Sequence, residues 1–190
     1  MKLGFFGTPE HSAKLLRSLV DSGFEISFVV TNEDKQAGRG KVLTPPPVKT
    51  TALELNSPVL QYGSIKTEEA KAEILRYEAD IYIVFAYGSI IPREIFENPK
   101  GGTINLHGSL LPKYRGASPI QSALLNDEKK TGMSLQYIVE ELDAGDILSA
   151  VEVGIDDSDN FASLLEKMTK LGTEELVRLL KDYKGKKFPA

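Results

Sequence analysis

The chain has 190 residues, of which 41% are hydrophobic and 26% are charged, and its formal net charge is −4. This length is sufficient for one domain with a buried core. The absence of cysteine excludes disulfides, thiol nucleophiles and zinc sites built from cysteine. Two histidines are too few for a metal centre built from histidine alone, and no apolar run is long enough to span a membrane. The composition favours a cytoplasmic, monomeric, metal-independent protein that does not coat nucleic acid by charge alone.

The first thirty residues predict a strand, a helix and a second strand. An apolar run over 2–6 predicts the first strand, and Thr8 is expected to cap a helix with Pro9 at its first position. Gly23 would end that helix, and the β-branched run Ile26–Val30 predicts the next strand. This order is typical of a right-handed βαβ unit and indicates a parallel sheet.

The segment Thr31–Pro47 shows no helical or strand periodicity, so we expect a long loop. It contains Arg39 and Lys41 among glycines and ends in three prolines. These cations form a local basic patch on an acidic chain, and surface lysines and arginines of this kind are usually solvated.

The rest of the chain alternates predicted strands and helices. We expect helices over 48–55, 67–77, 118–125 and 159–183, and strands over 59–60, 80–86, 103–106, 133–139 and 146–153. The strand at 80–86 is apolar on both faces, as the centre of a parallel sheet requires. Leu75, Met133 and Met168 are expected in the core. The pattern predicts an α/β fold with a Rossmann-like, doubly wound, mostly parallel sheet and helices on both faces. Residues 1–183 would form one domain and 184–190 the start of a linker.

Several common functional motifs are absent or incomplete. No G-x-G-x-x-G follows the first strand, which argues against a nicotinamide site. Gly38–Val42 lacks the Ser or Thr of a P-loop, and Gly108-Ser109 lacks the flanking pattern of a nucleophile elbow. We expect His11 on the exposed side of the first helix or near its start, without a functional role.

The most informative stretch runs from Asn105 to Gly116. Asn105 and His107 are two residues apart on a predicted strand, so their side chains share a face. They lie at the carboxyl end of that strand, where open α/β sheets bind ligands. An amide donor beside an imidazole can hold a developing oxyanion, and Asp143, in a loop after a separate strand, could reach them and handle protons. A hydrogen-bonded polar pair at a strand end would explain Asn-x-His alone equally well.

The segment Asn105–Pro112, with Arg115-Gly116 and Leu142–Gly145, resembles the signature of the folate-dependent formyltransferases. Within that superfamily, nearly the whole chain is similar to the N-terminal catalytic domain of the methionyl-tRNA formyltransferase family. Four further stretches support this resemblance: Phe6–Pro9, Ala37–Lys41, Thr44–Lys49 and Ala86–Gly88 leading to Ile91-Pro92. The family normally adds a C-terminal barrel domain that helps to bind tRNA, which these residues do not include.

The resemblance implies the formyltransferase fold, with 10-formyltetrahydrofolate as formyl donor and the α-amino group of initiator methionyl-tRNA as acceptor. Asn105 and His107 would stabilise the oxyanion of the tetrahedral intermediate, and Asp143 would orient the imidazole or relay a proton. Arg39 and Lys41 would contact tRNA phosphate. The resemblance assigns folate contacts to Phe85, Ala86, Tyr87, Gly88, Ser89, Ile90, Ile91, Ser109, Leu110, Leu111 and Pro112.

Two other functions share much of this pattern. A formyltransferase acting on a small amine, such as glycinamide ribonucleotide or an amino sugar nucleotide, would keep the same trio but would not need the basic loop. A non-catalytic folate-binding module would keep the pocket and could lose the trio.

Overall fold

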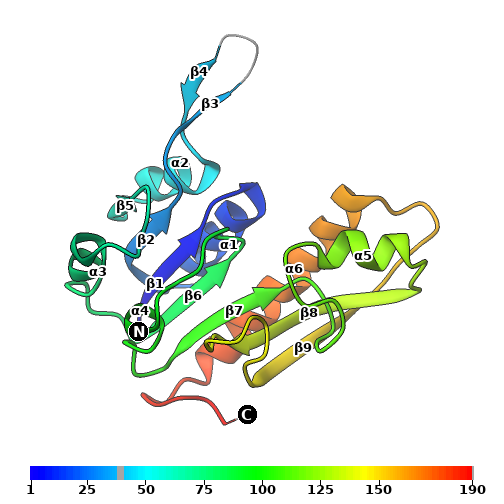
Figure 1. Ribbon diagram of the computed structural model, residues 1–190. Helices are drawn as coiled ribbons and strands as arrows, with labels where there is room; N and C mark the ends of the chain where they lie inside the picture. Colours follow the sequence, from blue (N-terminus) through cyan, green and yellow to red (C-terminus); the bar gives the residue numbers. More distant parts are fainter. Residues whose placement is uncertain (38–40, 190) are drawn as a thin grey trace. The chain divides into compact units, whose positions relative to one another are not determined.

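The structure is a computed structural model that describes residues 1–37 and 41–189. The chain divides into two compact units, Met1–Thr103 and Ile104–Ala190, which we call unit 1 and unit 2. Each contains strands and helices (Figure 1).

The strands that form the main sheet of unit 1 pair in parallel. β1 (Lys2–Gly7) pairs with β2 (Glu25–Thr31) and with β6 (Ile81–Phe85), and β2 pairs with β5 (Val59–Gln61). Every residue of β6 is buried, as its apolar sequence predicts. Phe6, Phe28 and Tyr82 pack ring against ring in the core, with centroids 5.3–5.7 Å apart. The predicted βαβ unit is confirmed.

Four helices accompany these strands: α1 (Glu10–Asp21), α2 (Pro47–Glu54), α3 (Glu68–Ile74) and the short α4 (Arg93–Phe96), which the sequence did not predict. The predicted cap of α1 was wrong. Pro9 occupies the N-cap position. The Thr8 hydroxyl does not cap the helix but donates a hydrogen bond to the carbonyl of Tyr87 at 3.1 Å. The inward placement of Leu75 was also wrong: it follows the last turn of α3 and is exposed.

The segment predicted as a loop contains a β-hairpin, formed by β3 (Lys35–Ala37) and β4 (Val42–Thr44) (Figure 1). Its base is tied to unit 1 through Asp34, which accepts hydrogen bonds from Lys49 Nζ at 2.8 Å and from Gln61 Nε2 at 2.9 Å. The bond from Lys49, and to a smaller extent the bond from Gln61, holds the pKa of Asp34 below its usual value.

Unit 2 is built on antiparallel strands. β8 (Lys130–Tyr137) pairs with β7 (Thr103–His107) and with β9 (Ile147–Gly154). The helix α6 (Phe161–Lys181) packs on β8 and β9, and Gly172 allows it to approach Met133 so closely that an added Cβ would lie 2.6 Å from the Met133 side chain. Met133 and Met168 are buried as predicted. The short helix α5 (Pro119–Leu125) packs against α6 and β8.

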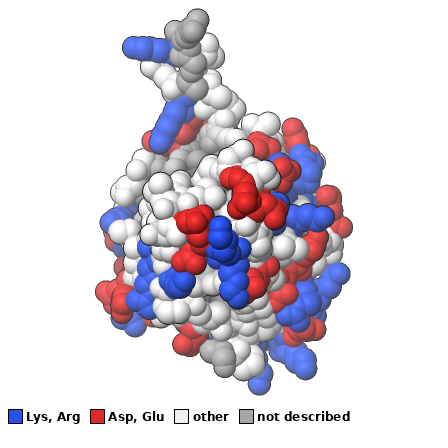
Figure 2. Space-filling model, turned by 90° about the vertical axis from the view of Figure 1, so that its right-hand side faces the viewer, with Lys and Arg blue, Asp and Glu red and all other residues white. Residues whose placement is uncertain are grey.

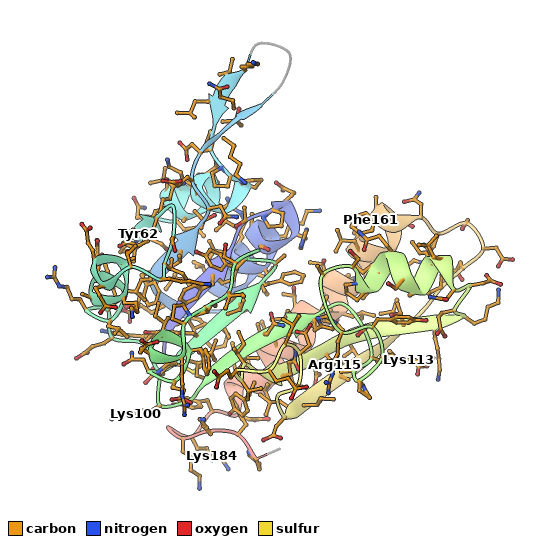
Figure 3. All side chains as sticks on the ribbon, in the orientation of Figure 1. Tyr62, Lys100, Lys113, Arg115, Phe161 and Lys184 are labelled. Atoms are coloured by element: carbon orange, nitrogen blue, oxygen red, sulfur yellow. The ribbon has the colours of Figure 1, made fainter. Side chains whose placement is uncertain are left out.

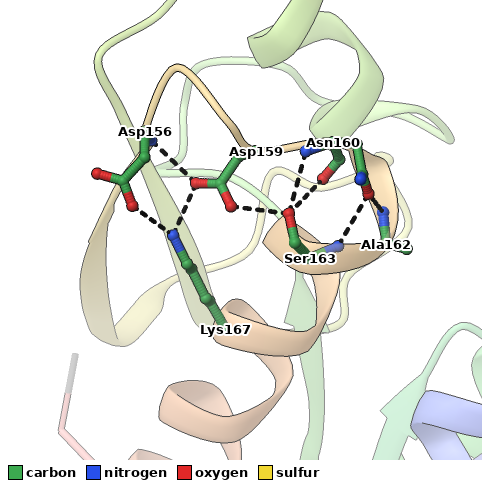
Figure 4. A network of polar contacts seen from close by, with 6 residues as sticks. All are labelled: Asp156, Asp159, Asn160, Ala162, Ser163 and Lys167. Carbon is green, nitrogen blue, oxygen red and sulfur yellow. Dashed lines mark hydrogen bonds and ion pairs between the residues drawn. The ribbon is translucent and has the colours of Figure 1, made fainter.

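A polar network fixes the start of α6 (Figure 4). The Asn160 side chain accepts hydrogen bonds from the backbone N–H groups of Ala162 and Ser163, and the Ser163 hydroxyl accepts one from the Asn160 N–H. This reciprocal arrangement is a capping box. Lys167 Nζ lies 2.7 Å from carboxylate oxygens of both Asp156 and Asp159, which precede the helix.

The predicted α/β fold with a mostly parallel, Rossmann-like sheet is confirmed; the antiparallel pairs are β7–β8 and β8–β9 in unit 2 and the separate β3–β4 hairpin in unit 1. Among the described residues, no helix is both long and apolar enough to cross a membrane.

Candidate active site

Four polar side chains share one face of the unit 2 strands. Asn105 lies opposite Gln136, and His107 lies opposite Ser134, in the antiparallel pairing of β7 with β8. Directly opposed residues project to the same side of a sheet, whereas Met133, which contacts α6, has the other parity. The two predicted side chains therefore lie on the face of β7 and β8 that α6 does not cover.

Asp143 reaches His107, as the sequence analysis expected. Its Oδ2 lies 3.5 Å from Nδ1 of His107, and both side chains are less than 10% exposed. On the other side of the ring, His107 Nε2 lies 2.8 Å from the carbonyl oxygen of Tyr114. Because a carbonyl only accepts, Nε2 carries the hydrogen of this bond. The imidazole therefore has a hydrogen-bond partner at Nε2 and a carboxylate beside Nδ1.

The loop that carries Asp143 is held tightly against β8. Asp143 Oδ2 accepts a hydrogen bond from the Gly116 N–H at 2.8 Å, and the Asp146 carbonyl accepts one from the Tyr137 N–H at 3.0 Å. A Cβ on Gly145 would lie 1.8 Å from the Tyr137 carbonyl oxygen, so only glycine fits there. Asp143 itself has a φ of 49°, which is unusual for a residue with a side chain and is common at functional sites.

Gln136 is a member of this cluster that the sequence analysis did not single out. Its Nε2 donates to Oδ1 of Asp143 at 3.0 Å, and the residue is 2% exposed. Its Oε1 is buried and has no hydrogen-bond partner within the described part of the chain. An unsatisfied buried acceptor costs about 1–3 kcal/mol. The signal in the sequence was the alternation of polar and apolar residues in 133–137, which places Ser134 and Gln136 on one face.

The loop after β7 covers part of this face. Ser134 Oγ donates to the Ser109 carbonyl at 2.7 Å and accepts from the Leu111 N–H at 3.1 Å. Leu110 fills the space over Gly132, where a Cβ would lie 2.4 Å from the leucine side chain. Ser109 is buried, Leu110 and Leu111 are half-buried, and Pro112 is exposed. These four candidate folate contacts therefore lie in one loop beside His107.

The basic residues of the same loop are paired with carboxylates. Lys113 Nζ lies 2.9 Å from Glu128, and Arg115 lies 3.2 Å from Glu141 (Figure 3). The Tyr114 hydroxyl also donates to Glu128, at 2.7 Å. These contacts fix the backbone on either side of the Tyr114 carbonyl that His107 meets, and Tyr114 has a φ of 55°.

Asn105 differs from its neighbours because its side chain makes no hydrogen bond within the described residues. It is half-buried, so its amide remains accessible. An amide donor without a structural partner, two positions from an imidazole that is held by a carboxylate, is suited to bind a ligand oxygen that carries developing negative charge.

The other predicted folate contacts lie in unit 1, in and after β6. Phe85, Tyr87 and Ile91 are buried, while Ala86, Gly88, Ser89 and Ile90 are exposed; Ala86 and Gly88 have φ values of 49° and 84°. The Tyr87 carbonyl accepts hydrogen bonds from Thr8 and Asn32, which follow β1 and β2. The segment is therefore anchored at the carboxyl ends of three parallel strands. Burial raises the pKa of the Tyr87 hydroxyl to about 12.

A cavity of about 280 Å³ lies beside this segment within unit 1. It is lined by Tyr62, Gly63, Ser64, Ile65, Lys66, Tyr87, Ser89 and Ile90. Its volume is near the lower limit for ligand pockets. Ile90 is 72% exposed, so an apolar side chain is available to a ligand at this position. His11 lies near the start of α1, one of the two places expected for it; it is half-buried, its ring packs edge-on against Phe85, and burial lowers its pKa.

Of the two predicted tRNA contacts, Lys41 is exposed in the turn of the hairpin, and Arg39 lies outside the described residues. Lysine side chains on the described part of the hairpin appear in blue near the top of the space-filling view (Figure 2). Val42 and Leu43 of β4 are 66% and 65% exposed, so the hairpin presents apolar as well as basic side chains.

Comparison with known protein families gives the relationship directly. The model of a family described as formyl transferase matches residues 1–180. The chain belongs to the formyl transferase family. The matched range includes Asn105, His107 and Asp143, the segment Phe85–Ile91 and the hairpin.

Individual relatives agree with this assignment. The chain is 54% identical over 193 residues to a methionyl-tRNA formyltransferase of Leptospira interrogans and 44% identical over 189 residues to one of Listeria monocytogenes. The whole chain is covered in both cases, but it spans only 61% and 60% of those proteins.

Solved structures share the fold at lower identity. A phosphoribosylglycinamide formyltransferase from Bacillus halodurans has a TM-score of 0.79 at 20% identity, covering 97% of each chain. One from Anaplasma phagocytophilum has a TM-score of 0.76 at 22% identity, covering 95% of this chain and 85% of the other. These similarities show that the chain has the formyltransferase fold.

Proposed function

We propose that this chain catalyses formyl transfer from 10-formyltetrahydrofolate to the α-amino group of initiator methionyl-tRNA. The observation that carries the proposal is the cluster in unit 2, in which Asp143 lies 3.5 Å from His107 while the Asn105 amide has no partner within the described residues. The identity of 54% with a methionyl-tRNA formyltransferase supports this acceptor.

In the proposed reaction, the amine attacks the formyl carbon, and the carbonyl oxygen acquires negative charge. Asn105 donates a hydrogen bond to that oxygen. His107 Nε2 joins it when it exchanges the Tyr114 carbonyl, 2.8 Å away, for the substrate oxygen. Asp143 lies beside Nδ1 and relays the proton released by the attacking amine to the folate nitrogen, which leaves with that proton as its bond to the formyl carbon breaks and the carbonyl forms again.

For the donor, we propose contacts with two segments. The segment Phe85–Ile91 in unit 1 offers backbone groups and the exposed Ile90, and the loop Ser109–Pro112 in unit 2 adjoins His107. Apolar surface with a few backbone hydrogen-bonding groups suits a flat heterocycle.

For the acceptor, we propose that the hairpin contacts tRNA through Arg39 and Lys41, because cations that meet phosphate position a nucleic acid without reading its sequence. The hairpin is also the feature that favours tRNA over a small amine, for which it would serve no purpose. A non-catalytic folate-binding module is a weaker alternative because Asn105, His107 and Asp143 are all retained together. We expect the enzyme to act in the cytoplasm as a monomer.

The direct test measures formyl transfer to charged initiator methionyl-tRNA and, in parallel, to glycinamide ribonucleotide and an amino sugar nucleotide. We expect transfer to the tRNA, and a fall in kcat of about 10²–10³-fold in Asn105→Ala, because one oxyanion donor is lost. The melting temperature should stay unchanged, because Asn105 has no structural hydrogen bond to lose among the described residues. Transfer only to a small amine would replace the proposed acceptor, and undiminished turnover of Asn105→Ala would remove Asn105 from the mechanism.

A further inference from the structure

We propose that Gln136 is a positioning residue that fixes the Asp143 carboxylate for its role beside His107. The inference rests on the proposed function, because it concerns the same cluster. Gln136 does not touch the reacting atoms in this proposal; it acts through Asp143.

The geometry assigns a separate task to each oxygen of Asp143. Oδ2 accepts from the Gly116 N–H at 2.8 Å and lies 3.5 Å from His107 Nδ1, while Oδ1 accepts from Gln136 Nε2 at 3.0 Å. Without the Gln136 bond, the carboxylate can rotate and exchange its two oxygens. The bond therefore determines which oxygen faces the imidazole.

The orientation of the Gln136 amide follows from its partner. A carboxylate oxygen accepts, so the NH₂ end of the amide must face Asp143, and Oε1 must point away. Oε1 is then left buried and without a partner among the described residues. Because the bond to Asp143 is the only side-chain hydrogen bond that the amide makes there, this buried polar group is better explained by orienting Asp143 than by fold stability.

Gln136 also lies where it can affect the whole cluster. It is the cross-strand partner of Asn105, so one residue adjoins both the proposed oxyanion donor and the carboxylate that holds His107. A displacement of a catalytic group by about 1 Å can reduce turnover by about 10²-fold.

Two substitutions separate positioning from packing. Gln136→Met keeps the approximate volume and removes both polar atoms, and we expect kcat to fall by about 10–10²-fold with KM for donor and acceptor little changed. Gln136→Glu replaces the donor by an oxygen that can donate to Asp143 only when protonated. Its kcat relative to the wild type should therefore rise as the pH is lowered, whereas the ratio for Gln136→Met should stay constant.

The matched control is Thr169→Val. Thr169 is 6% exposed in α6, in the same unit, and its hydroxyl is also buried without a partner among the described residues. Thr169 has no proposed role in the cluster, so Thr169→Val should retain the wild-type kcat and its pH dependence. A merely structural effect of Gln136 would lower the melting temperature without the pH-dependent recovery of Gln136→Glu.

A second measurement reads the position of Asp143 without turnover. The chain has two histidines, so the imidazole ¹⁵N spectrum contains His107 and His11 alone, and His11 serves as an internal reference. We expect the His107 signals to change in Gln136→Met and to remain unchanged in Thr169→Val. Wild-type kcat together with an unchanged His107 spectrum in Gln136→Met would overturn the inference. If the wild type transfers formyl to no acceptor but the spectrum still responds, the proposed function fails and the positioning role of Gln136 stands.

Discussion

The position of Asp143 depends on a glycine of the same loop. Gly145 lies two residues later, and its α-carbon faces the Tyr137 carbonyl at a distance that excludes any side chain. This close approach holds the loop against β8, and the loop holds Asp143 with its φ of 49°. The backbone geometry at Gly145 is therefore part of the site.

We predict that Gly145→Ala reduces kcat by about 10²-fold or more, because the loop must move away from Tyr137 and take Asp143 with it. The matched control is Gly154→Ala at the end of β9, where a Cβ would meet nothing within 4 Å. Steady-state kinetics and thermal melts on both variants check this. Comparable kcat values for the two would show that the loop can shift without moving the carboxylate.

At this scale the sequence predicted the residues that local spacing reveals. Asn105 and His107 were placed together because residues two apart on a strand share a face. Gln136 and Tyr114 were not predicted, because their contacts depend on the register of β7 against β8 and on a backbone carbonyl, neither of which local spacing contains. The contact of the His11 ring with Phe85 was not predicted, because Phe85 is distant in sequence.

At the scale of elements, the N-terminal end of α6 is stabilised by ionised carboxylates that pair with Lys167. A hydrogen bond from Lys167, then one from the backbone of Asp156, holds the pKa of Asp159 at about 2, below its usual value of 3.8. A carboxyl whose pKa is lowered on folding stabilises the native state above its unfolded pKa. That contribution is lost as the pH falls from about 4 toward about 2.

We therefore predict that Asp159→Asn lowers the urea midpoint at neutral pH, and that its difference from the wild type shrinks as the pH falls from about 4 toward about 2. Urea unfolding at a series of pH values tests this. Asp157→Asn is the control, because Asp157 is fully exposed and its ion pair with Lys129 is long, at 3.9 Å. A difference between Asp159→Asn and the wild type that is independent of pH would contradict the role of the Lys167 pair.

The hairpin is the element that the sequence described least well. Its strands have three residues each, and the described side chains of both are exposed, so no apolar alternation marked them. By contrast, α6 was predicted because its helical spacing of apolar residues repeats over 21 residues, and β6 because it is an uninterrupted apolar run. The cap of α1 was predicted wrongly because the Thr8 hydroxyl donates to the Tyr87 carbonyl, in the segment after β6, which is distant in sequence.

If the hairpin meets tRNA phosphate, Lys41→Ala should raise KM for methionyl-tRNA and reduce the slope of log affinity against log salt by about 1, with kcat little changed. Tenfold variation of salt in the transfer assay provides the slope. Lys170→Ala, on the exposed side of α6, is the control and should keep the wild-type slope. A normal salt dependence in Lys41→Ala would mean that the hairpin does not bind phosphate through this residue.

For the whole molecule, composition and element order predicted the α/β class but not its division into two compact units. The strand–helix–strand order at the start of the chain predicted the parallel pairing of β1 with β2, because a crossover helix joins parallel neighbours. The paired strands β8 and β9 were expected from a turn around Asp143, yet their bulge and their exact length depend on tertiary contacts.

The hairpin's construction has a consequence for how acceptor choice can evolve. Lys35 and Thr44 face each other across β3 and β4, so the chain leaves and returns at nearly the same point. None of its described side chains belongs to the core, and its base is closed by Asp34, Lys49 and Gln61. Insertions, deletions or replacement of this segment can therefore accumulate without re-optimising the fold or the chemistry. If the hairpin binds tRNA as proposed, such changes would let the same scaffold acquire or lose a macromolecular substrate.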